Sequence, residues 1–257
     1  MTHKRDNRVE RAARGGPGEL ALLLHDSSLE VLEALLQNPF LNEDHLLTLL
    51  HRKNLPREFL ELVAQNEELM RSERAKAAVV GHPKTPRLVS LRLLKWLYLF
   101  DLVRISLEPA VPAEIKRLAE EQIINRLEQL ALGQQISLAR RSSAHVAAAL
   151  LEWGNEPVIP AALENLHLTE AALIQVLRRD DIPVAVVEAI ARHPKWSLQY
   201  DVRLQLVRHP LTPLAIALGF LPNLKSSDLL LIASDKRMRA TLREYVETEA
   251  RQRLKKR

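Results

Sequence analysis

The sequence predicts an all-α protein built from two tandem pseudo-repeats, in which Asn38 of the first copy aligns with Asn165 of the second. Aromatic residues make up only 4% of the chain and there are 7 glycines, a composition that favours helices over sheets. One stretch of the first half matches the second half without a gap, and each copy consists of short amphipathic runs separated by proline. With 257 residues, 47% of them hydrophobic, the chain can form one elongated domain or two ordinary ones.

The internal repeat aligns residues 38–105 with residues 165–232, a constant offset of 127 positions. Of these 68 positions 20 are identical, and 13 of the identities are not leucine, so chance matches in a leucine-rich chain do not explain them. The non-leucine identities of the first copy are Asn38, Glu43, Arg52, Pro56, Glu61, Ala64, Val80, His82, Pro83, Thr85, Pro86, Asp101 and Ile105. Duplication of one helical unit is the economical explanation.

Capping residues and prolines mark the helix starts in each copy. Asn42 and Thr169 are N-cap types, and a glutamate, which favours the positive end of a helix, follows each of them. Pro56 and Pro183 fit the first helical position, where a missing N–H costs nothing. The sequence therefore predicts two short helices in each of these segments.

A His-Pro-x-Thr-Pro motif occurs once in each copy, as HPKTP and HPLTP. A residue before proline is biased away from the α region, so a helix should end near the histidine. The threonine can then cap the next helix, with the second proline at its first position. We therefore expect a bend between helices at residues His82, Pro83, Thr85, Pro86, His209, Pro210, Thr212 and Pro213.

The two motif histidines have a functional and a structural interpretation. Catalysis or metal binding needs a second group at a suitable spacing, and no His-Glu-x-x-His or His-x-x-x-His pair lies near them. The structural interpretation is favoured, with the histidines bonding carbonyls at a helix C-terminus. No catalytic residue, metal or cofactor is predicted.

Between the copies, the sequence predicts one long amphipathic helix. Pro112 is a plausible start and Gly133 a plausible end, with apolar residues at helical spacing between them. A further helix should end near Gly154 and another should follow Glu156.

The basic residues are concentrated at the two ends of the chain. Residues 1–16 carry five basic and two acidic groups and residues 251–257 carry five basic groups, so the remainder of this +5 chain has a net charge of −3. We expect a flexible basic tail over residues 1–18, helical halves over residues 19–135 and 136–250, and a second basic tail over residues 251–257.

The chain is predicted to be cytoplasmic. It has no cysteine, which suits a reducing compartment and excludes disulfides and thiolate metal sites. No secretory signal is visible at the start, and the most apolar run is interrupted by Lys95, Asp101 and Arg104, so membrane insertion is not expected.

The phrases VVGHPKTPRLVSLRLL and LVRHPLTPLAIALGFL resemble the HEAT-like and leucine-rich repeat variant proteins of bacteria. The resemblance covers most of residues 20–250 and implies a right-handed α-solenoid of short stacked helices, with the two halves forming one continuous solenoid. It implies a binding platform more than an activity. The iron–sulfur cluster of the repeat-variant family does not transfer, because its cysteine ligands are missing.

Two polar or aromatic features are candidates for partner contacts. Arg140 and Arg141 open the second half and could meet a phosphate or an acidic partner, although an exposed turn is the ordinary explanation. Trp196 stands at an element end and could anchor a partner, like Trp96 and Trp153, although tryptophans are more often packed between helices.

Two functions from different classes follow. The first is a non-enzymatic scaffold that binds a protein partner along its repeats. The alternative is a nucleic-acid-binding solenoid, similar to HEAT-like DNA glycosylases, in which Arg52, Arg178 and Arg179 contact phosphates. The charge of −3 outside the tails disfavours the alternative. An enzyme with its site in a groove would need ionisable groups that converge from distant positions.

Overall fold

A computed structural model of the chain describes residues 2–235 and 238–255, with side chains for residues 7–235 and 238–253. Throughout these residues the regular structure is helical, with eighteen α-helices, four short 3-10 helices and no strand. The all-α prediction is confirmed. The chain divides into two compact units, Met1–Asn125 and Arg126–Arg257.

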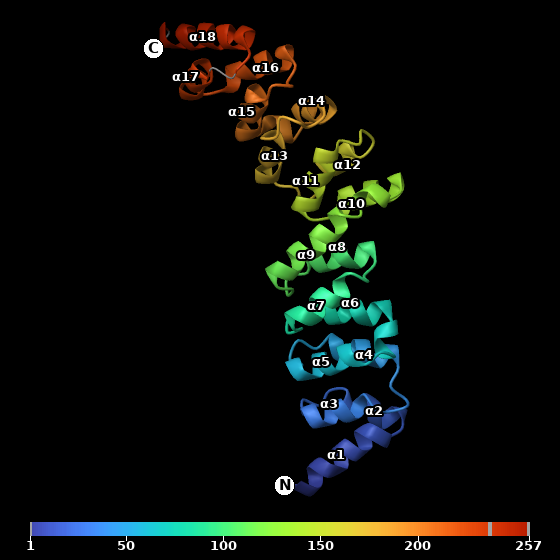
Figure 1. Cartoon of the computed structure of the whole chain (residues 1–257). Coiled ribbons are helices and arrows are strands. Elements are labelled where there is room, and N and C mark those ends of the chain that lie inside the picture. The colour runs from blue at the N-terminus through green and yellow to red at the C-terminus, as the bar shows by residue number, and fades with distance from the viewer. Residues whose placement is uncertain (1, 236–237, 256–257) are drawn as a thin grey trace. The chain divides into compact units, whose positions relative to one another are not determined.

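The first unit contains nine α-helices and one 3-10 helix among its described residues. They are α1 (Thr2–Arg14), α2 (Pro17–Leu23), α3 (Leu29–Leu35), α4 (Glu43–Leu50), α5 (Arg57–Gln65), η1 (Leu69–Arg71), α6 (Glu73–Gly81), α7 (Arg87–Leu94), α8 (Leu99–Leu107) and α9 (Ala113–Ile124). Figure 1 shows them stacked in successive pairs, with α4, α6 and α8 on one side and α3, α5, α7 and α9 on the other.

The second unit also contains nine described α-helices. The elements are η2 (Leu127–Gln129), α10 (Leu132–Arg141), α11 (Ala144–Trp153), α12 (Ile159–Leu163), α13 (Glu170–Leu177), α14 (Val184–Arg192), η3 (Trp196–Leu198), α15 (Tyr200–Arg208), α16 (Leu214–Phe220), η4 (Leu221–Asn223), α17 (Ser226–Ser234) and α18 (Ala240–Lys255). In this unit α10 packs on α12, α11 on α13, α12 on α14 and α13 on α15. The same pattern occurs in the first unit, where α4 packs on α6 and α6 on α8.

Several elements of the two units have the same bounds once Asn38 is aligned with Asn165. The alignment superimposes the bounds of α4 on α13, α5 on α14, η1 on η3, α6 on α15 and α8 on α17 at both ends. Each unit buries a core of aliphatic side chains. In the second, Leu206 and Val207 of α15 are fully buried, as are Val79 and Val80 of α6 in the first.

A buried asparagine anchors the start of each unit in the same way. Asn38 donates from Nδ2 to the carbonyls of Ala12 at 2.8 Å and Gly15 at 3.0 Å. Asn165 donates to the carbonyls of Ala139 at 2.7 Å and Ser142 at 3.0 Å, which occupy the aligned positions of the second copy. These bonds tie the end of α1 and the end of α10 to the turn that precedes the next pair of helices.

The chain ends differ from the flexible tails expected from the sequence. Residues 2–14 form α1, where Ala12 is fully buried and Arg8 and Arg11 pair with Asp26 and Glu19 at 2.8 Å. These charged residues are helical because one apolar stripe of α1 packs on α3. Residues 251–255 belong to α18, and residues 1, 256 and 257 lie outside the described residues.

The helix between the copies is shorter than predicted. α9 ends at Ile124, a 3-10 turn follows, and Gly133 lies inside α10 instead of ending a helix. A second difference concerns proline, because Pro56 and Pro183 occupy the N-cap, with ψ of 148° and 141°, one residue before the first helical position. The predicted N-caps at Asn42 and Thr169 are confirmed, since their side chains accept from the amides of His45 and Ala172.

Candidate binding groove

The His-Pro-x-Thr-Pro motif forms the same set of hydrogen bonds in both units. His82 Nε2 donates to the carbonyl of Arg52 at 2.9 Å, just beyond the C-terminus of α4, and its Nδ1 accepts from the amide of Lys84 at 3.1 Å. His209 repeats both bonds with the carbonyl of Arg179 and the amide of Leu211. Both ring nitrogens of each histidine are therefore used in holding the bend.

The electrostatics of His82 agree with this geometry. Burial of the ring lowers its pKa, an effect that the bond to the Arg52 carbonyl partly opposes and nearby Lys84 reinforces. The ring is neutral at pH 7, with the proton on Nε2, because Nδ1 accepts from a backbone amide. This is the carbonyl-bonding arrangement expected from the sequence.

The motif threonines do not cap the next helix, contrary to the prediction. Thr85 Oγ1 donates back to the carbonyl of Val79 at 2.5 Å, and Thr212 does the same to Leu206. The N-caps of α7 and α16 are Pro86 and Pro213. The carbonyls of Val79 and Leu206 cannot receive an amide bond from the fourth residue on, because that residue is Pro83 or Pro210, and a threonine hydroxyl bonds to each of them beside the amide of His82 or His209.

A groove of about 520 Å³ opens between α4, α6 and α8 of the first unit. Its floor is apolar, with Leu47 and Leu50 from α4, Ala77 and Ala78 from α6 and Ile105 from α8. We call it the α4–α6–α8 groove. Its volume lies within the range of about 300–1,000 Å³ that is typical of ligand sites.

Small residues on α6 create the width of this groove. Ala77, Ala78 and Gly81 all line it, and a Cβ built on Gly81 would meet no atom within 4 Å. The space above Gly81 is therefore open. At the aligned positions of α15 the second unit has Leu204, Gln205 and Arg208.

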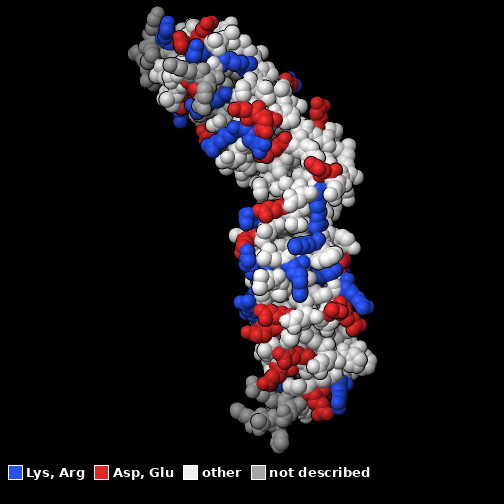
Figure 2. Space-filling model, in the orientation of Figure 1, with Lys and Arg blue, Asp and Glu red and all other residues white. Residues whose placement is uncertain are grey.

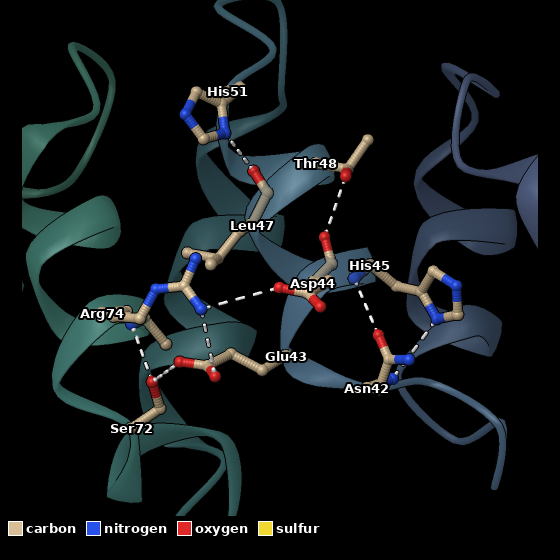
Figure 3. A network of polar contacts seen from close by, with 10 residues as sticks. Asn42, Glu43, Asp44, His45, Leu47, Thr48, His51, Ser72 and Arg74 are labelled. Carbon is tan, nitrogen blue, oxygen red and sulfur yellow. Dashed lines mark hydrogen bonds and ion pairs between the residues drawn. The ribbon is translucent and has the colours of Figure 1, made fainter.

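Charged side chains of both signs form the rim. Arg74 lies 3.5 Å from Glu43 and 3.6 Å from Asp44, while Glu43 also accepts a hydrogen bond from Ser72 (Figure 3). His51 points away from this cluster and bonds the carbonyl of Leu47 through Nδ1 at 2.6 Å. The acidic end of α4 thus lies beside the exposed Arg74 at one edge of the groove.

The far edge of the α4–α6–α8 groove is formed by α8. Arg104 pairs with Asp101 at 3.0 Å, and Glu108 lines the same edge. Lys53, in the turn after α4, is exposed and has no side-chain partner among the described residues. Lys53 is therefore available to a bound molecule.

The second unit has a smaller pocket at the corresponding place. About 370 Å³ in volume, it is lined by Leu177 and His209, by three arginines, Arg178, Arg208 and Arg239, and by two aspartates, Asp180 and Asp235. Arg208 stands where Gly81 stands in the first unit. The larger side chains of α15 thus occupy space that is empty above α6.

The partner-contact residues expected from the sequence lie in separate places within the second unit. Arg140 and Arg141 are exposed at the end of α10, and Arg178 lines the small pocket. Arg179 is held by Asp181 at 3.0 Å and Glu152 at 3.3 Å. The bond from Arg179 lowers the pKa of the Asp181 carboxyl.

Trp196 is not a surface anchor. It is 2% exposed, its Nε1 donates to the carbonyl of Leu163 at 2.9 Å, and Lys195 covers its ring at 3.9 Å. The expectation of a partner contact is wrong here because the ring packs between helices, the other interpretation open from the sequence. The most exposed tryptophan is Trp96, at 68%.

Sequence reasoning missed the three residues that open the groove. Ala77, Ala78 and Gly81 carry no motif, and alanine in a helix indicates only helix formation. The sequence difference between the two copies could have pointed to these residues. Ala77, Ala78 and Gly81 align with the larger Leu204, Gln205 and Arg208.

The described residues contain neither a metal-binding cluster nor a membrane-spanning helix. Within the part of the chain that the structure describes, no group of three His, Asp or Glu side chains is arranged to hold a metal ion. None of the helices there has the length and apolarity that a membrane span requires.

Comparison with known proteins assigns no family. No protein-family model matches the chain, and no curated protein or solved structure matches it. The resemblance to HEAT-like repeats accordingly stays a prediction.

Proposed function

We propose that this chain is a non-enzymatic protein-binding module built as an α-solenoid from two pseudo-repeats. Five pairs of elements whose bounds coincide in the alignment of the two copies support the duplication, as do the matched bonds of Asn38 and Asn165 and of His82 and His209. Repeat units of this kind form extended binding surfaces.

The observation that carries the proposal is the open α4–α6–α8 groove. An apolar floor with a charged rim has the composition of a protein interface, in which apolar contacts supply affinity and rim charges supply orientation. Small residues on α6 allow another backbone to approach closely. The proposed ligand is therefore a segment of a partner protein with small or aliphatic side chains toward the floor and charges toward Lys53, Arg74 and Glu108.

The test fills the groove with the side chain that the second unit carries. Gly81→Arg should be tolerated because the space at its Cβ is open, and Gly133→Arg is a matched control on an exposed helical glycine that is equally unobstructed. Wild type and both variants are used to capture proteins from the native cell, followed by mass spectrometry. We expect at least one protein to bind wild type and Gly133→Arg and to be lost with Gly81→Arg.

The captured partner is then titrated in purified form against the same three chains. A loss of at least about tenfold in affinity for Gly81→Arg supports the groove. Equal affinities for all three chains, or capture that is the same for all three, would contradict it.

Nucleic-acid binding is the second candidate, supported by the three arginines that line the pocket of the second unit, although Asp180 and Asp235 line it too. Arg178 and Arg208 have no side-chain partner among the described residues, whereas Arg179 forms ion pairs with Asp181 and Glu152. Titration with single-stranded and duplex DNA at low salt tests this function. Binding that weakens steeply with salt and is lost in Arg178→Ala would favour it over the protein-binding function.

A further inference from the structure

Helix α7 presents three large side chains in one line on the surface of the first unit. Leu88, Arg92 and Trp96 follow one another at intervals of four residues; Leu88 and Arg92 share one face of α7, and Trp96 lies two residues beyond the last helical residue, Leu94. Leu88 is 76% and Trp96 68% exposed, and Arg92 is also exposed. We call these three residues the α7 stripe.

Two hollows lie beside the stripe, between α5 and α7. One, of about 280 Å³, contains Arg57, Leu88 and Val89, and the other, of about 400 Å³, contains Met70 and Trp96. Gln65 and Arg92 line both hollows and lie between them, and we call the two hollows together the groove between α5 and α7. None of the residues that line this groove lines the α4–α6–α8 groove.

Arg92 is held in position at the middle of the stripe. Its Nη2 donates to the carbonyl of Ala64, near the end of α5, at 2.6 Å. A guanidinium has five N–H donors, so this bond fixes the fork and leaves other donors for a bound carboxylate. A side chain that is already fixed loses less entropy when it binds.

The charge around the stripe favours an acidic ligand. Of the four cationic residues that line the two hollows, Arg57, Lys76 and Arg87 pair with Glu61, Glu73 and Glu114, whereas Arg92 pairs with no carboxylate among the described residues. In the view of Figure 2, Lys and Arg atoms gather over the part of the first unit that α6–α9 form, while Asp and Glu atoms are concentrated nearer α3–α5. Within the lining of this groove, the positive charge that no carboxylate pairs is that of Arg92, which bonds a backbone carbonyl.

The second unit lacks the stripe although it keeps the helix. The residues aligned with Leu88, Arg92 and Trp96 are Ala215, Gly219 and Asn223. Tryptophan and arginine are the side chains most enriched at the energetic centres of protein interfaces, and alanine and glycine provide little contact. The fold of the repeat thus does not require the three large side chains.

We propose that the groove between α5 and α7 binds an acidic amphipathic helix of a partner protein. Its carboxylate meets Arg92, and aliphatic side chains one turn before and after that carboxylate pack on Leu88 and Trp96. A helix fits because a row of side chains on one helix inserts into the groove between two others. A single-stranded nucleic acid is the less favoured ligand, since carboxylates already pair Arg57 at 3.2 Å and Arg87 at 2.8 Å, and Leu88 offers no stacking surface.

The experiment selects a displayed library of helical peptides, about four turns long and randomised on one face, against the full chain. We expect the recovered peptides to carry Asp or Glu flanked by aliphatic residues four positions away. Each should bind at least about tenfold more weakly to Trp96→Asn and to Arg92→Met, which keeps helix propensity and removes the charge. Recovery of no peptide, recovery of basic peptides, or equal affinity for these variants would overturn the proposal.

Transfer of the stripe gives a second, independent readout. Ala215→Leu, Gly219→Arg and Asn223→Trp are combined in a chain that also carries Arg92→Met, and the open space at the Cβ of Gly219 accommodates the new side chain. We expect this transfer to restore peptide binding. A fluorescent oligothymidylate that binds the stripe more tightly than the peptides would also overturn the proposal. Gly81→Arg should leave peptide binding unchanged, so failure of the α4–α6–α8 groove and failure of this proposal are distinguishable.

Discussion

The two units keep the same buried polar anchors and differ where side chains reach the surface. His82 and His209 hold equivalent carbonyls and Asn38 and Asn165 hold equivalent pairs, with distances that agree within 0.1 Å for each matched carbonyl bond. Above α6 and along α7, in contrast, small residues of one unit stand where the other has large ones. The buried anchors determine how the helices stack in each unit, so residues at the surface can differ between the units without changing the fold.

Loss of an asparagine anchor should have the largest effect on stability, and a similar one in each unit. Asn38→Ala removes bonds to two carbonyls and one from the amide of Phe40, in a side chain that is 4% exposed. We expect a loss of about 3 kcal/mol in the free energy of unfolding, because buried backbone groups are left without partners. Asn165→Ala should cost about the same, measured by urea denaturation.

This expectation depends on the anchors being equivalent. If one variant lost almost no free energy of unfolding while the other lost several kcal/mol, the equivalent hydrogen bonds of the two units would not contribute equally to stability.

Replacement of a motif histidine should cost less. His82→Ala and His209→Ala each lose the bond to a carbonyl beyond α4 or α13 and the bond from the amide two residues ahead. We expect each to lower the free energy of unfolding by about 2 kcal/mol. Replacement of a catalytic or metal-binding histidine would instead leave stability almost unchanged. A loss near zero in the same urea titrations would therefore contradict the structural role.

The open groove predicts a gain in stability from filling it. Gly81→Ala adds a Cβ to empty space on α6 and removes the backbone entropy cost of glycine in a helix. We expect the free energy of unfolding to rise by about 0.5–1 kcal/mol. A loss of stability in thermal denaturation would mean that the space above Gly81 is already occupied.

The pH dependence of His82 gives the smallest effect. Because burial lowers its pKa in the folded chain, the unfolded chain binds more protons below its ordinary value of 6.5. The contribution of neutral His82 is therefore complete above pH 6.5 and is lost as the pH falls toward the lowered value. The difference in unfolding free energy between wild type and His82→Gln should shrink from pH 8 to pH 5, and a difference that grows would contradict the assignment.

Local backbone rules predicted much of the fold because they act within a few residues. A residue before proline leaves the α region, and the helices indeed end at His82 and His209, the C-caps of α6 and α15. Gly154 adopts φ 73° at the end of α11, as a glycine at a helix C-terminus often does. Gly133 was misassigned because a glycine on an exposed helix face costs only about 1 kcal/mol and does not end the helix.

The candidate sites were less accessible from the sequence because they depend on which residues meet in space. Trp196 and Trp96 both stand at element ends, yet one is buried and the other exposed. Only packing decides between them. The groove above α6 results from missing side chains, and an alanine has no pattern that distinguishes a filled neighbourhood from an open one.

Exchange of the α6 surface between the units tests the central claim most directly. One chain carries Ala78→Gln and Gly81→Arg, and its reciprocal carries Gln205→Ala and Arg208→Gly. The measurement is the affinity of each chain for the partner captured by wild type. We expect the first chain to lose at least about tenfold in affinity while the reciprocal chain binds like wild type. Unchanged binding by the first chain, or a loss confined to the reciprocal chain, would contradict the account.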